Sequence, residues 1–458
     1  MFGNYSFLCT GFLIGGWLEK IRQKKALFFL CRETNKNSRA FRKPYEMSEM
    51  EKYDIVIAGA GPAGLTAAVE LSKKFKILVV ERREPGTTSC TWYSYADRVK
   101  KYGIEDAVVA RFDRIRFTSP TQAHDMIDDA VTLDHNKVLQ IWLERAKKQG
   151  AVVRQESFQA YHYTTGGIVI KTNKDEYFAR LFIDAMGSGS PVIRRHQLIK
   201  RHDAWVIYGA AVEHKKHEKP YVLEYYPLND RDNTYVGIHP YSDTLTNIYV
   251  FQGRYNTMGN PADLKEIFKK TLKELEPNGK KVQNLAGTIV SGSLKKYALD
   301  RIIFFGASGM LNPDGCGMGF NEILKQYQTF ARGVTAAMKN DALDQKTLSK
   351  IADSLRNQET MNFQKIIGAF SLYFIKSEGK WDGGVKWLNA MGEDSKYWMR
   401  NEFTMDWIMR ANLRLHKVIP IKETISMIPM DNLAFVLEQL ARFSVKAATS
   451  VVRNKILK

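Results

Sequence analysis

Hydrophobic and polar positions are most regular between residues 53 and 81, where two apolar runs flank a glycine turn and a helical segment. Residues 53–58, YDIVIA, are apolar and rich in β-branched side chains, which is typical of a strand buried on both faces. A helix is expected at residues 65–74, and residues 76–80, KILVV, repeat the apolar pattern of the first run. The pattern therefore predicts a strand, a turn, a helix and a second, parallel strand.

The rest of the chain alternates between strand-like and helical stretches. A helix is expected at residues 137–149, and three strand-like runs within residues 221–252 predict an antiparallel sheet. Residues 301–305 form another buried strand before a glycine-rich loop, and the chain beyond residue 340 is helical and basic. The remaining short runs with strand character are residues 112–119, 126–133, 156–163, 168–172 and 177–183.

These elements predict an α/β fold in which a Rossmann-like cofactor-binding domain carries an inserted antiparallel sheet for the substrate and ends in a helical carboxyl-terminal region. The expected organisation is an amino-terminal extension at 1–50, a cofactor domain in two parts at 51–190 and 291–345, the substrate-binding sheet at 191–290, and the helical region at 346–458.

The turn after the first strand has the glycine spacing of a dinucleotide-binding fingerprint, GAGPAG. Gly59 allows a tight turn, Gly61 lets the backbone approach a pyrophosphate, and Gly64 lets the helix pack closely on the strand. Pro62 suits the first helical turn, because the N–H that it lacks would have no partner there. The free N–H groups of this helix end would face the phosphates. We count Ala63 among the expected cofactor contacts with these four residues.

Glu81 stands at the end of the second strand, 20 residues past Gly61. At about this offset a carboxylate accepts hydrogen bonds from the adenosine ribose. Its charge would repel the 2′-phosphate of NADP, so we interpret Arg82 as a solvated neighbour within the cofactor site. Because strand, glycines, helix, strand and acid fall in register, the segment favours a dinucleotide cofactor over a structural turn.

A second glycine-rich loop, GASGMLNPDGCGMGF, follows the strand at residues 301–305 and leads into a helix. Such a loop makes a second cradle for ribityl, pyrophosphate or flavin groups. An extended FAD lying across both cradles explains them better than NAD does, while residues 184–190, DAMGSGS, form either a further cofactor contact or a plain turn. The expected contacts in the late loop are Gly306, Pro313, Gly315, Gly317 and Met318.

The segment after Pro85 and Gly86 should cross the face of the flavin if the cofactor is FAD. Arg98 would then reach a phosphate, the alternative being an exposed charge on a helix. Cys90 or Trp92 would line the isoalloxazine, the alternative for Cys90 being a small buried residue.

Charge bears on the choice of partners. The 458 residues carry a net charge of +19 and have a pI near 9.5, which favours anionic partners. No nucleic-acid recognition motif is present, so a basic face toward anionic lipid and a merely solvated surface stay open.

No apolar run reaches the roughly 18 residues that cross a bilayer, and we expect a cytoplasmic location with, at most, peripheral membrane contact. Residues 7–17 are either an interfacial anchor or lie upstream of a true start at Met47 or Met50.

Metal binding is not expected. The four cysteines are widely spaced and form no C-x-x-C motif, which argues against a zinc site and against a disulfide framework. His214 and His217 lie three residues apart in HKKHEK, as two ligands on one helix face would, but the neighbouring lysines would repel a cation. We therefore predict a solvated loop there.

Taken together, GAGPAG with Glu81, the DAMGSGS turn and the GMLNP loop resemble the FAD-dependent family that contains geranylgeranyl reductases, lycopene cyclases and aromatic hydroxylases. The resemblance covers roughly residues 53–340 and is specific for FAD rather than for the reaction. LEYYP followed by YVGIHP resembles the strands around the Tyr-x-Trp-x-Phe-Pro motif of geranylgeranyl reductases. Tyr235 matches that motif, whereas Gly237 and His239 replace its tryptophan and phenylalanine. The Cys-Gly-Gly signature of the reductases becomes Cys90-Thr91-Trp92, and the Gly-Asp pair common before the late loop is absent.

The resemblance implies an FAD-dependent oxidoreductase that reduces double bonds of an isoprenoid or another apolar lipid. No motif identifies its electron donor. The expected catalytic residues are His239, Cys90 and Tyr235, with His239 as proton donor because an unperturbed imidazole titrates near neutrality. The alternative to this role is that His239 is an ordinary structural histidine of a strand. A lycopene-cyclase-like isomerase and an aromatic hydroxylase are the alternative enzymes, and the absent Gly-Asp pair favours the non-enzyme alternative, a flavin-binding scaffold.

Overall fold

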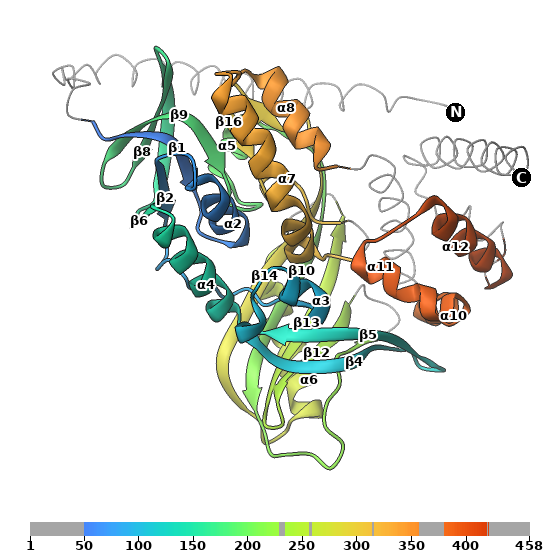
Figure 1. Ribbon diagram of the computed structural model, residues 1–458. Coiled ribbons are helices and arrows are strands. Elements are labelled where there is room, and N and C mark those ends of the chain that lie inside the picture. Colours follow the sequence, from blue (N-terminus) through green and yellow to red (C-terminus); the bar gives the residue numbers. More distant parts are fainter. Residues whose placement is uncertain are drawn as a thin grey trace, which may run out of the picture. The chain divides into compact units, whose positions relative to one another are not determined.

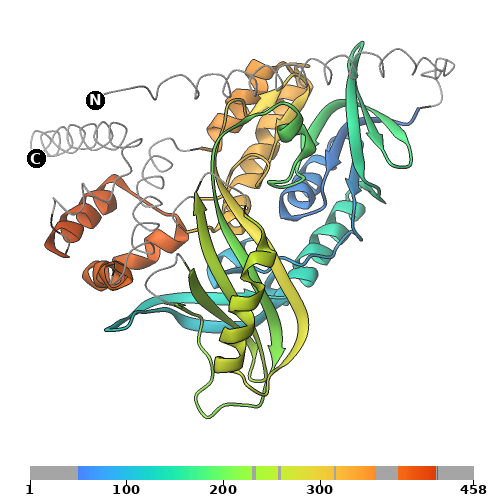
Figure 2. The ribbon, with the colours of Figure 1, turned by 180° about the vertical axis from the view of Figure 1, so that it is seen from behind.

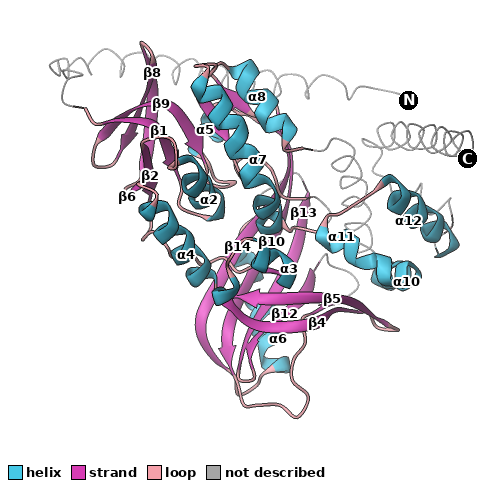
Figure 3. Ribbon diagram, viewed as in Figure 1, coloured by secondary structure: helices cyan, strands magenta, loops and turns pink. Residues whose placement is uncertain are grey.

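The computed structural model describes residues 50–228, 234–255, 259–313, 316–356, 380–418 and 420. The chain divides into two compact units, Met1–Met50 and Glu51–Lys458, and the elements below all belong to the second. Within the described residues they form two eight-stranded sheets with helices packed around them (Figures 1 and 3). No helix of this part of the chain is long and apolar enough to cross a membrane.

The first sheet contains the predicted parallel strands. Its central path runs β15-β16-β9-β1-β2-β6, and the hairpin of β7 and β8 extends it from β9. The pairs from β16 to β6 are parallel, while β15, β7 and β8 pair antiparallel. The strands are β1 Lys52–Ala58, β2 Ile77–Glu81, β6 Val152–Gln155, β7 Phe158–Thr164, β8 Gly167–Thr172, β9 Glu176–Asp184, β15 Ala298–Leu299 and β16 Ile302–Phe304.

Both faces of this sheet are covered, which explains its unbroken apolar strands. On β1, Ile55 and Ile57 pack into a core with α2, α4, α7 and α8, and Val56 packs into a second core on the opposite face. The strand, helix and parallel strand predicted around the glycine turn are therefore confirmed. The helices around this sheet are α2 Pro62–Leu71, α4 His135–Lys148, α5 Pro191–Arg195, α7 Gly319–Lys339 and α8 Gln345–Ser354.

The second sheet has the order β14-β10-β13-β12-β11-β4-β5-β3, with antiparallel pairs throughout except for β11 and β4. Helix α6 lies across one face (Figure 2), where Phe268 packs on Val206 and Ile248. The other face carries many aromatic side chains. The elements are β3 Tyr93–Tyr95, α3 Ala96–Lys101, η1 Glu105–Ala107, β4 Val108–Thr118, β5 Ala123–Leu133, β10 Ile199–Glu213, β11 Glu224–Pro227, β12 Thr234–Ser242, β13 Leu245–Tyr255, η2 Pro261–Leu264, α6 Lys265–Leu275 and β14 Lys280–Leu294.

The second sheet draws on more of the chain than residues 191–290. Strands β3, β4 and β5 belong to it, although the sequence prediction assigned residues 93–133 to the cofactor domain. Strands near β4 and β5 were expected, at residues 112–119 and 126–133, whereas β3 was not. An alternating pattern does not say which sheet a strand joins. The domain bounds given above stay predictions.

The carboxyl-terminal helices pack against the aromatic face of the second sheet. Val385, Leu388 and Met399 share a core with Phe117 and Tyr225 of that face. The elements are α10 Lys380–Met391, η3 Gly392–Ser395, α11 Lys396–Arg400 and α12 Met405–Val418. The predicted helical character is confirmed for these residues.

Candidate active site

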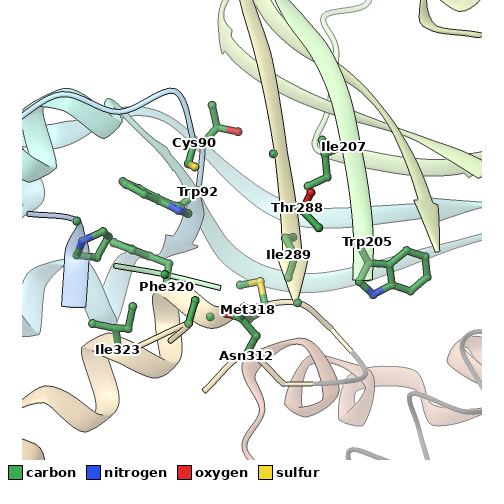
Figure 4. Close-up of a pocket in the computed structure, with 18 of the residues that line it drawn as sticks. Cys90, Trp92, Trp205, Ile207, Thr288, Ile289, Asn312, Met318, Phe320 and Ile323 are labelled. Atoms are coloured by element: carbon green, nitrogen blue, oxygen red, sulfur yellow. The ribbon is translucent and has the colours of Figure 1, made fainter. Parts of the chain in front are cut away.

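A cavity of about 910 Å³ lies between the two sheets. One end is lined by the turns that follow β1, β2 and β9, and the other by the aromatic face of the second sheet and by α10 to α12. Figure 4 shows the middle, with Trp92 and Phe320 on one side and Ile289 and Ile207 of the second sheet on the other. The cavity thus joins a polar turn region to an apolar region.

The glycine turn after β1 forms the floor of the polar end. Gly59 has a φ of +104°, and a Cβ there would overlap the carbonyl oxygen of Ala185. A Cβ on Gly64 would overlap the carbonyl oxygen of Gly59, so this glycine allows α2 to approach the turn. Gly61, in contrast, has an ordinary φ of −77° and lines the cavity, and a Cβ there would meet nothing within 4 Å. The turn therefore presents open space and the N-terminus of a 10-residue helix to a ligand.

Glu81 lines the same end of the cavity. Its Oε2 accepts a hydrogen bond from Ala60 N at 2.7 Å, and its Oε1 accepts one from Arg83 N at 2.9 Å. Because a carboxylate has about four acceptor positions, each oxygen retains one for a ribose hydroxyl. Pro62, Ala63 and Arg82 also line the cavity.

Replacing Glu81 should weaken binding of an adenosine-containing cofactor. Glu81→Ala removes charge-assisted hydrogen bonds worth about 1.5 to 3 kcal/mol, which corresponds to roughly 10- to 150-fold weaker binding. Equilibrium dialysis of FAD against the apoprotein measures this loss. Glu84→Ala is the matched control, because Glu84 is exposed and does not line the cavity. Equal FAD affinities in the two variants would contradict the assignment.

The DAMGSGS turn after β9 also reaches the cavity, through Ala185, Met186, Gly187 and Gly189. Asp184 holds it: its carboxylate accepts hydrogen bonds from the Ser190 hydroxyl and, at 3.1 Å, from Met186 N. Its carbonyl oxygen accepts one from Ser308 Oγ at 2.6 Å. Complete burial raises the pKa of Asp184 to about 7. Asp184 thus joins this turn to the late glycine-rich loop, a role that the sequence did not reveal because its partner lies 124 residues away.

The late loop contributes part of its expected contacts. Gly317 and Met318 line the cavity, whereas Gly306 and Pro313 do not. Gly306 has a φ of +74°, and a Cβ there would collide with the Cβ of Ala63, so it serves the packing of the loop on α2. Gly315 lies outside the described residues.

Cys90 and Trp92 line the middle of the cavity (Figure 4). The Trp92 ring stacks on Phe320 with ring centroids 5.0 Å apart and an interplanar angle of 7°. Cys90 is an exposed free thiol rather than a small buried residue. Two segments more than 200 residues apart in sequence thus form one aromatic wall.

Arg98 does not reach the cavity, which corrects the expected phosphate contact. Its Nη2 donates to Glu402 Oε1 at 2.6 Å and to the carbonyl oxygen of Arg400 at 2.7 Å. The alternative of an exposed helix charge is wrong too, because the residue is 4% exposed. The end of α11 and the segment after it supply these partners, and the local sequence around Arg98 contains no sign of them.

His239 and Tyr235 line the apolar end of the cavity. The imidazole Nε2 of His239 lies 2.9 Å from the hydroxyl of Tyr225. Burial lowers the pKa of His239 to about 3, so the ordinary pKa assumed for a proton donor is wrong and the ring is neutral near pH 7. The Tyr235 ring stacks on Phe251, with centroids 4.7 Å apart, and on Trp381 of α10.

The buried neutral His239 should make the protein less stable in acid. Its pKa is lower in the folded than in the unfolded chain, so its contribution is present above pH 6.5 and is lost as the pH falls toward 3. Between pH 6.5 and pH 3, His239 increases the slope of unfolding free energy against pH by at most about 1.4 kcal/mol per pH unit. His239→Gln should flatten the slope measured by urea unfolding between pH 6.5 and 4.5, while the exposed His162→Gln should not. An unchanged slope in His239→Gln would show that the histidine titrates normally.

The apolar end is completed by residues that the sequence did not single out as ligands. Trp381, Trp387 and Trp398 line it together with Leu388 and Met399. The indole N–H of Trp381 donates to the carbonyl oxygen of Thr118 at 2.6 Å. This hydrogen bond holds the Trp381 ring of α10 against β4. The sequence predicted only that this region is helical and basic.

The residues of the polar end fit FAD. The fit rests on an open cradle at Gly61, a carboxylate with free acceptor positions 20 residues later, and a second turn that faces the same space. Glu81, the turn after β9, Trp92 and Met318 all line this cavity and would hold such a dinucleotide.

Known proteins resemble this chain both in its amino-terminal segment and in its fold. Residues 38–91, which include the glycine turn and Glu81, match the model of the Thi4 family. A digeranylgeranylglycerophospholipid reductase from Haloferax volcanii is 26% identical over 154 residues, which are 31% of this chain and 38% of the relative's length. The matched part is thus less than half of that relative.

Solved structures share the fold over most of the chain. A geranylgeranyl bacteriochlorophyll reductase-like protein from Thermoplasma acidophilum has a TM-score of 0.65 at 16% identity, over 83% of this chain and all of that one. The halogenase PltM, solved with phloroglucinol and FAD, has a TM-score of 0.58 at 14% identity, over 86% of this chain and 96% of its own. By its fold and its amino-terminal nucleotide-binding sequence, this chain is therefore an FAD-binding flavoprotein, with geranylgeranyl reductase-like proteins and flavin-dependent halogenases among its structural relatives.

Proposed function

We propose that this protein is an FAD-dependent oxidoreductase that reduces carbon–carbon double bonds of an isoprenoid or another apolar lipid. The observation that carries the proposal is the cavity itself, in which the cofactor cradle opens directly into a space walled by aromatic and aliphatic side chains. The name of the Haloferax volcanii relative, a reductase of a digeranylgeranyl lipid, supports the same substrate class.

Reduced FAD would supply the hydride, and the protein would bind and orient the substrate. Burial of an isoprenoid chain against the apolar end gains about 25 cal/mol per Å² of apolar surface. The stacked rings of Tyr235, Phe251 and Trp381 give that wall a fixed shape. The same side chains exclude water from the reacting double bond.

The three expected catalytic residues take separate roles in this proposal. His239 is neutral and hydrogen-bonded to Tyr225, so we assign it to positioning the substrate rather than to acid catalysis. Cys90, a free thiol that lines the middle of the cavity, is the proposed proton donor to the second carbon. Tyr235 belongs to the substrate wall.

Product mass tests the reaction. The protein is reduced with dithionite without oxygen, which removes any dependence on the natural electron donor, and is then given a geranylgeranyl lipid. Each reduction adds two hydrogens to the lipid. An isomer of unchanged mass would point to the cyclase alternative, and a product that gains oxygen only in air would point to the hydroxylase. No product of any kind would favour the flavin-binding scaffold.

We further propose that the basic chain meets anionic lipid at its surface. The net charge of +19 carries this proposal, and an apolar substrate would be drawn from a membrane. The protein should co-sediment with vesicles of phosphatidylserine and phosphatidylcholine at low salt and less as salt rises, because screening shortens the reach of exposed charges. Vesicles of phosphatidylcholine alone are the control. Equal binding to both vesicle types would contradict an electrostatic contact.

A further inference from the structure

A cluster of His214, His217 and Glu276 lies outside the flavin cavity. The candidate ligand atoms of the three side chains all lie within 4.8 Å of one another. His214 directly follows β10, His217 belongs to the loop after it, and Glu276 follows the last turn of α6. The fold thus adds a carboxylate, 59 residues from His217 in sequence, to the two histidines that share the HKKHEK segment.

We propose that these three side chains bind a divalent transition-metal ion, which joins the loop after β10 to the end of α6. Two imidazoles and one carboxylate form a ligand set that suits Zn²⁺, with water in the fourth position. Mg²⁺ and Ca²⁺ prefer sets made of oxygen atoms.

Hydrogen bonds around the cluster already orient its ligands. His214 Nδ1 lies 2.9 Å from the carbonyl oxygen of Lys215, so Nδ1 carries the proton, and Nε2 accepts a hydrogen bond from the Thr246 hydroxyl at 2.9 Å, which a metal ion would displace. Tyr221 donates from its hydroxyl to Glu276 Oε1 at 2.7 Å. A donor of this kind behind a ligand holds it in place.

The side chains can also come together on one ion. His217 Nε2 lies 2.6 Å from Glu276 Oε1, so these two groups already face each other. The rings of His214 and His217 stack with centroids 4.9 Å apart. The side chain of His217 is 38% exposed, which gives an ion a route from solvent.

The lysines that argued against a metal are less of an obstacle in the folded protein. Lys216 forms an ion pair with Asp243 at 2.6 Å, which offsets its charge. Lys215 contributes its carbonyl oxygen rather than its ammonium group to the cluster.

Zinc binding to the whole protein tests the proposal. Full-length, tag-free, FAD-loaded protein is treated with a chelator, dialysed and titrated with Zn²⁺ alone by calorimetry. We expect one equivalent to bind, with affinity at least 100-fold lower in His217→Ala and in Glu276→Gln. Tyr221→Phe, which keeps all three ligands, should lower the affinity about 10-fold or more. His196→Ala, an exposed histidine elsewhere, is the control and should bind as the unchanged protein does.

Zinc K-edge absorption identifies the ligands. The proposal predicts only nitrogen and oxygen neighbours, near 2.0 to 2.2 Å, and none of the sulfur neighbours near 2.3 Å that a cysteine would give. Sulfur in the first shell, full binding by the His217→Ala and Glu276→Gln proteins, or no stoichiometric zinc on the folded protein would each overturn it. Circular dichroism of every variant confirms that a lost site is not a lost fold.

Discussion

A protein that carries Gly61→Val will fold and contain no flavin. Gly61 has a φ of −77°, which valine adopts, and its Cβ would meet no protein atom within 4 Å. The new side chain would instead project into the cavity, where the pyrophosphate must approach the backbone. We therefore expect the purified variant to lack the absorption near 450 nm while its circular dichroism matches that of the unchanged apoprotein.

Gly64→Ala separates this effect from a packing defect. A Cβ at Gly64 would overlap the carbonyl oxygen of Gly59, so this change should lower the melting temperature of the apoprotein as well as its flavin content. Gly61→Val should lower only the flavin content. If the Gly61→Val protein were purified with a full complement of FAD, the cradle would be misassigned.

Asp128→Asn will destabilise the attachment of the carboxyl-terminal helices by about 3 kcal/mol, because it leaves a largely buried arginine without its main partner. Arg400, at the end of α11, donates to both carboxylate oxygens of Asp128 at 2.7 Å. The side chains are 14% and 5% exposed. The Arg400 guanidinium also lies 4.3 Å from the centroid of the Tyr95 ring. Urea unfolding followed by tryptophan fluorescence should show an earlier transition, since Trp387 and Trp398 lie in this region.

The neighbouring residue provides the matched control. Asp129 pairs with Arg111, but those side chains are 42% and 67% exposed. Asp129→Asn should therefore change stability by less than about 1 kcal/mol. Equal effects of the two substitutions would mean that the Arg400 pair does not hold the helices. Because Trp398 and Met399 of α11 line the apolar end, Asp128→Asn should also weaken substrate binding more than FAD binding.

The local sequence was sufficient to predict a site when all of the residues of that site come from one segment. The turn from Gly59 to Gly64 and the acid at Glu81 lie within one strand-helix-strand unit, so their spacing fixes their geometry before any long-range contact forms. The same holds for β1, whose unbroken apolar pattern reflects cores on both faces of the sheet. These features were predicted, and the structure confirms the elements that carry them.

Long-range contacts account for what was not predicted. Arg98 turns from the cavity because Glu402, 304 residues later, offers a carboxylate. The ordinary pKa assumed for His239 failed because aromatic side chains from other strands bury it, Tyr225 among them. Glu276 joins the two histidines of the HKKHEK segment only through the packing of α6. None of these partners can be recognised from the sequence next to the residue that it contacts.

The most direct test of the proposed function is a single anaerobic turnover. The FAD-loaded protein is reduced with one equivalent of dithionite and mixed with a geranylgeranyl lipid, and the absorption near 450 nm is followed with time. Lipid reduction predicts that this absorption returns in step with the double bonds lost, and that a fully saturated lipid of the same length leaves the flavin reduced. A flavin that stays reduced in the presence of the unsaturated lipid, and is reoxidised only when oxygen is admitted, would contradict the proposal.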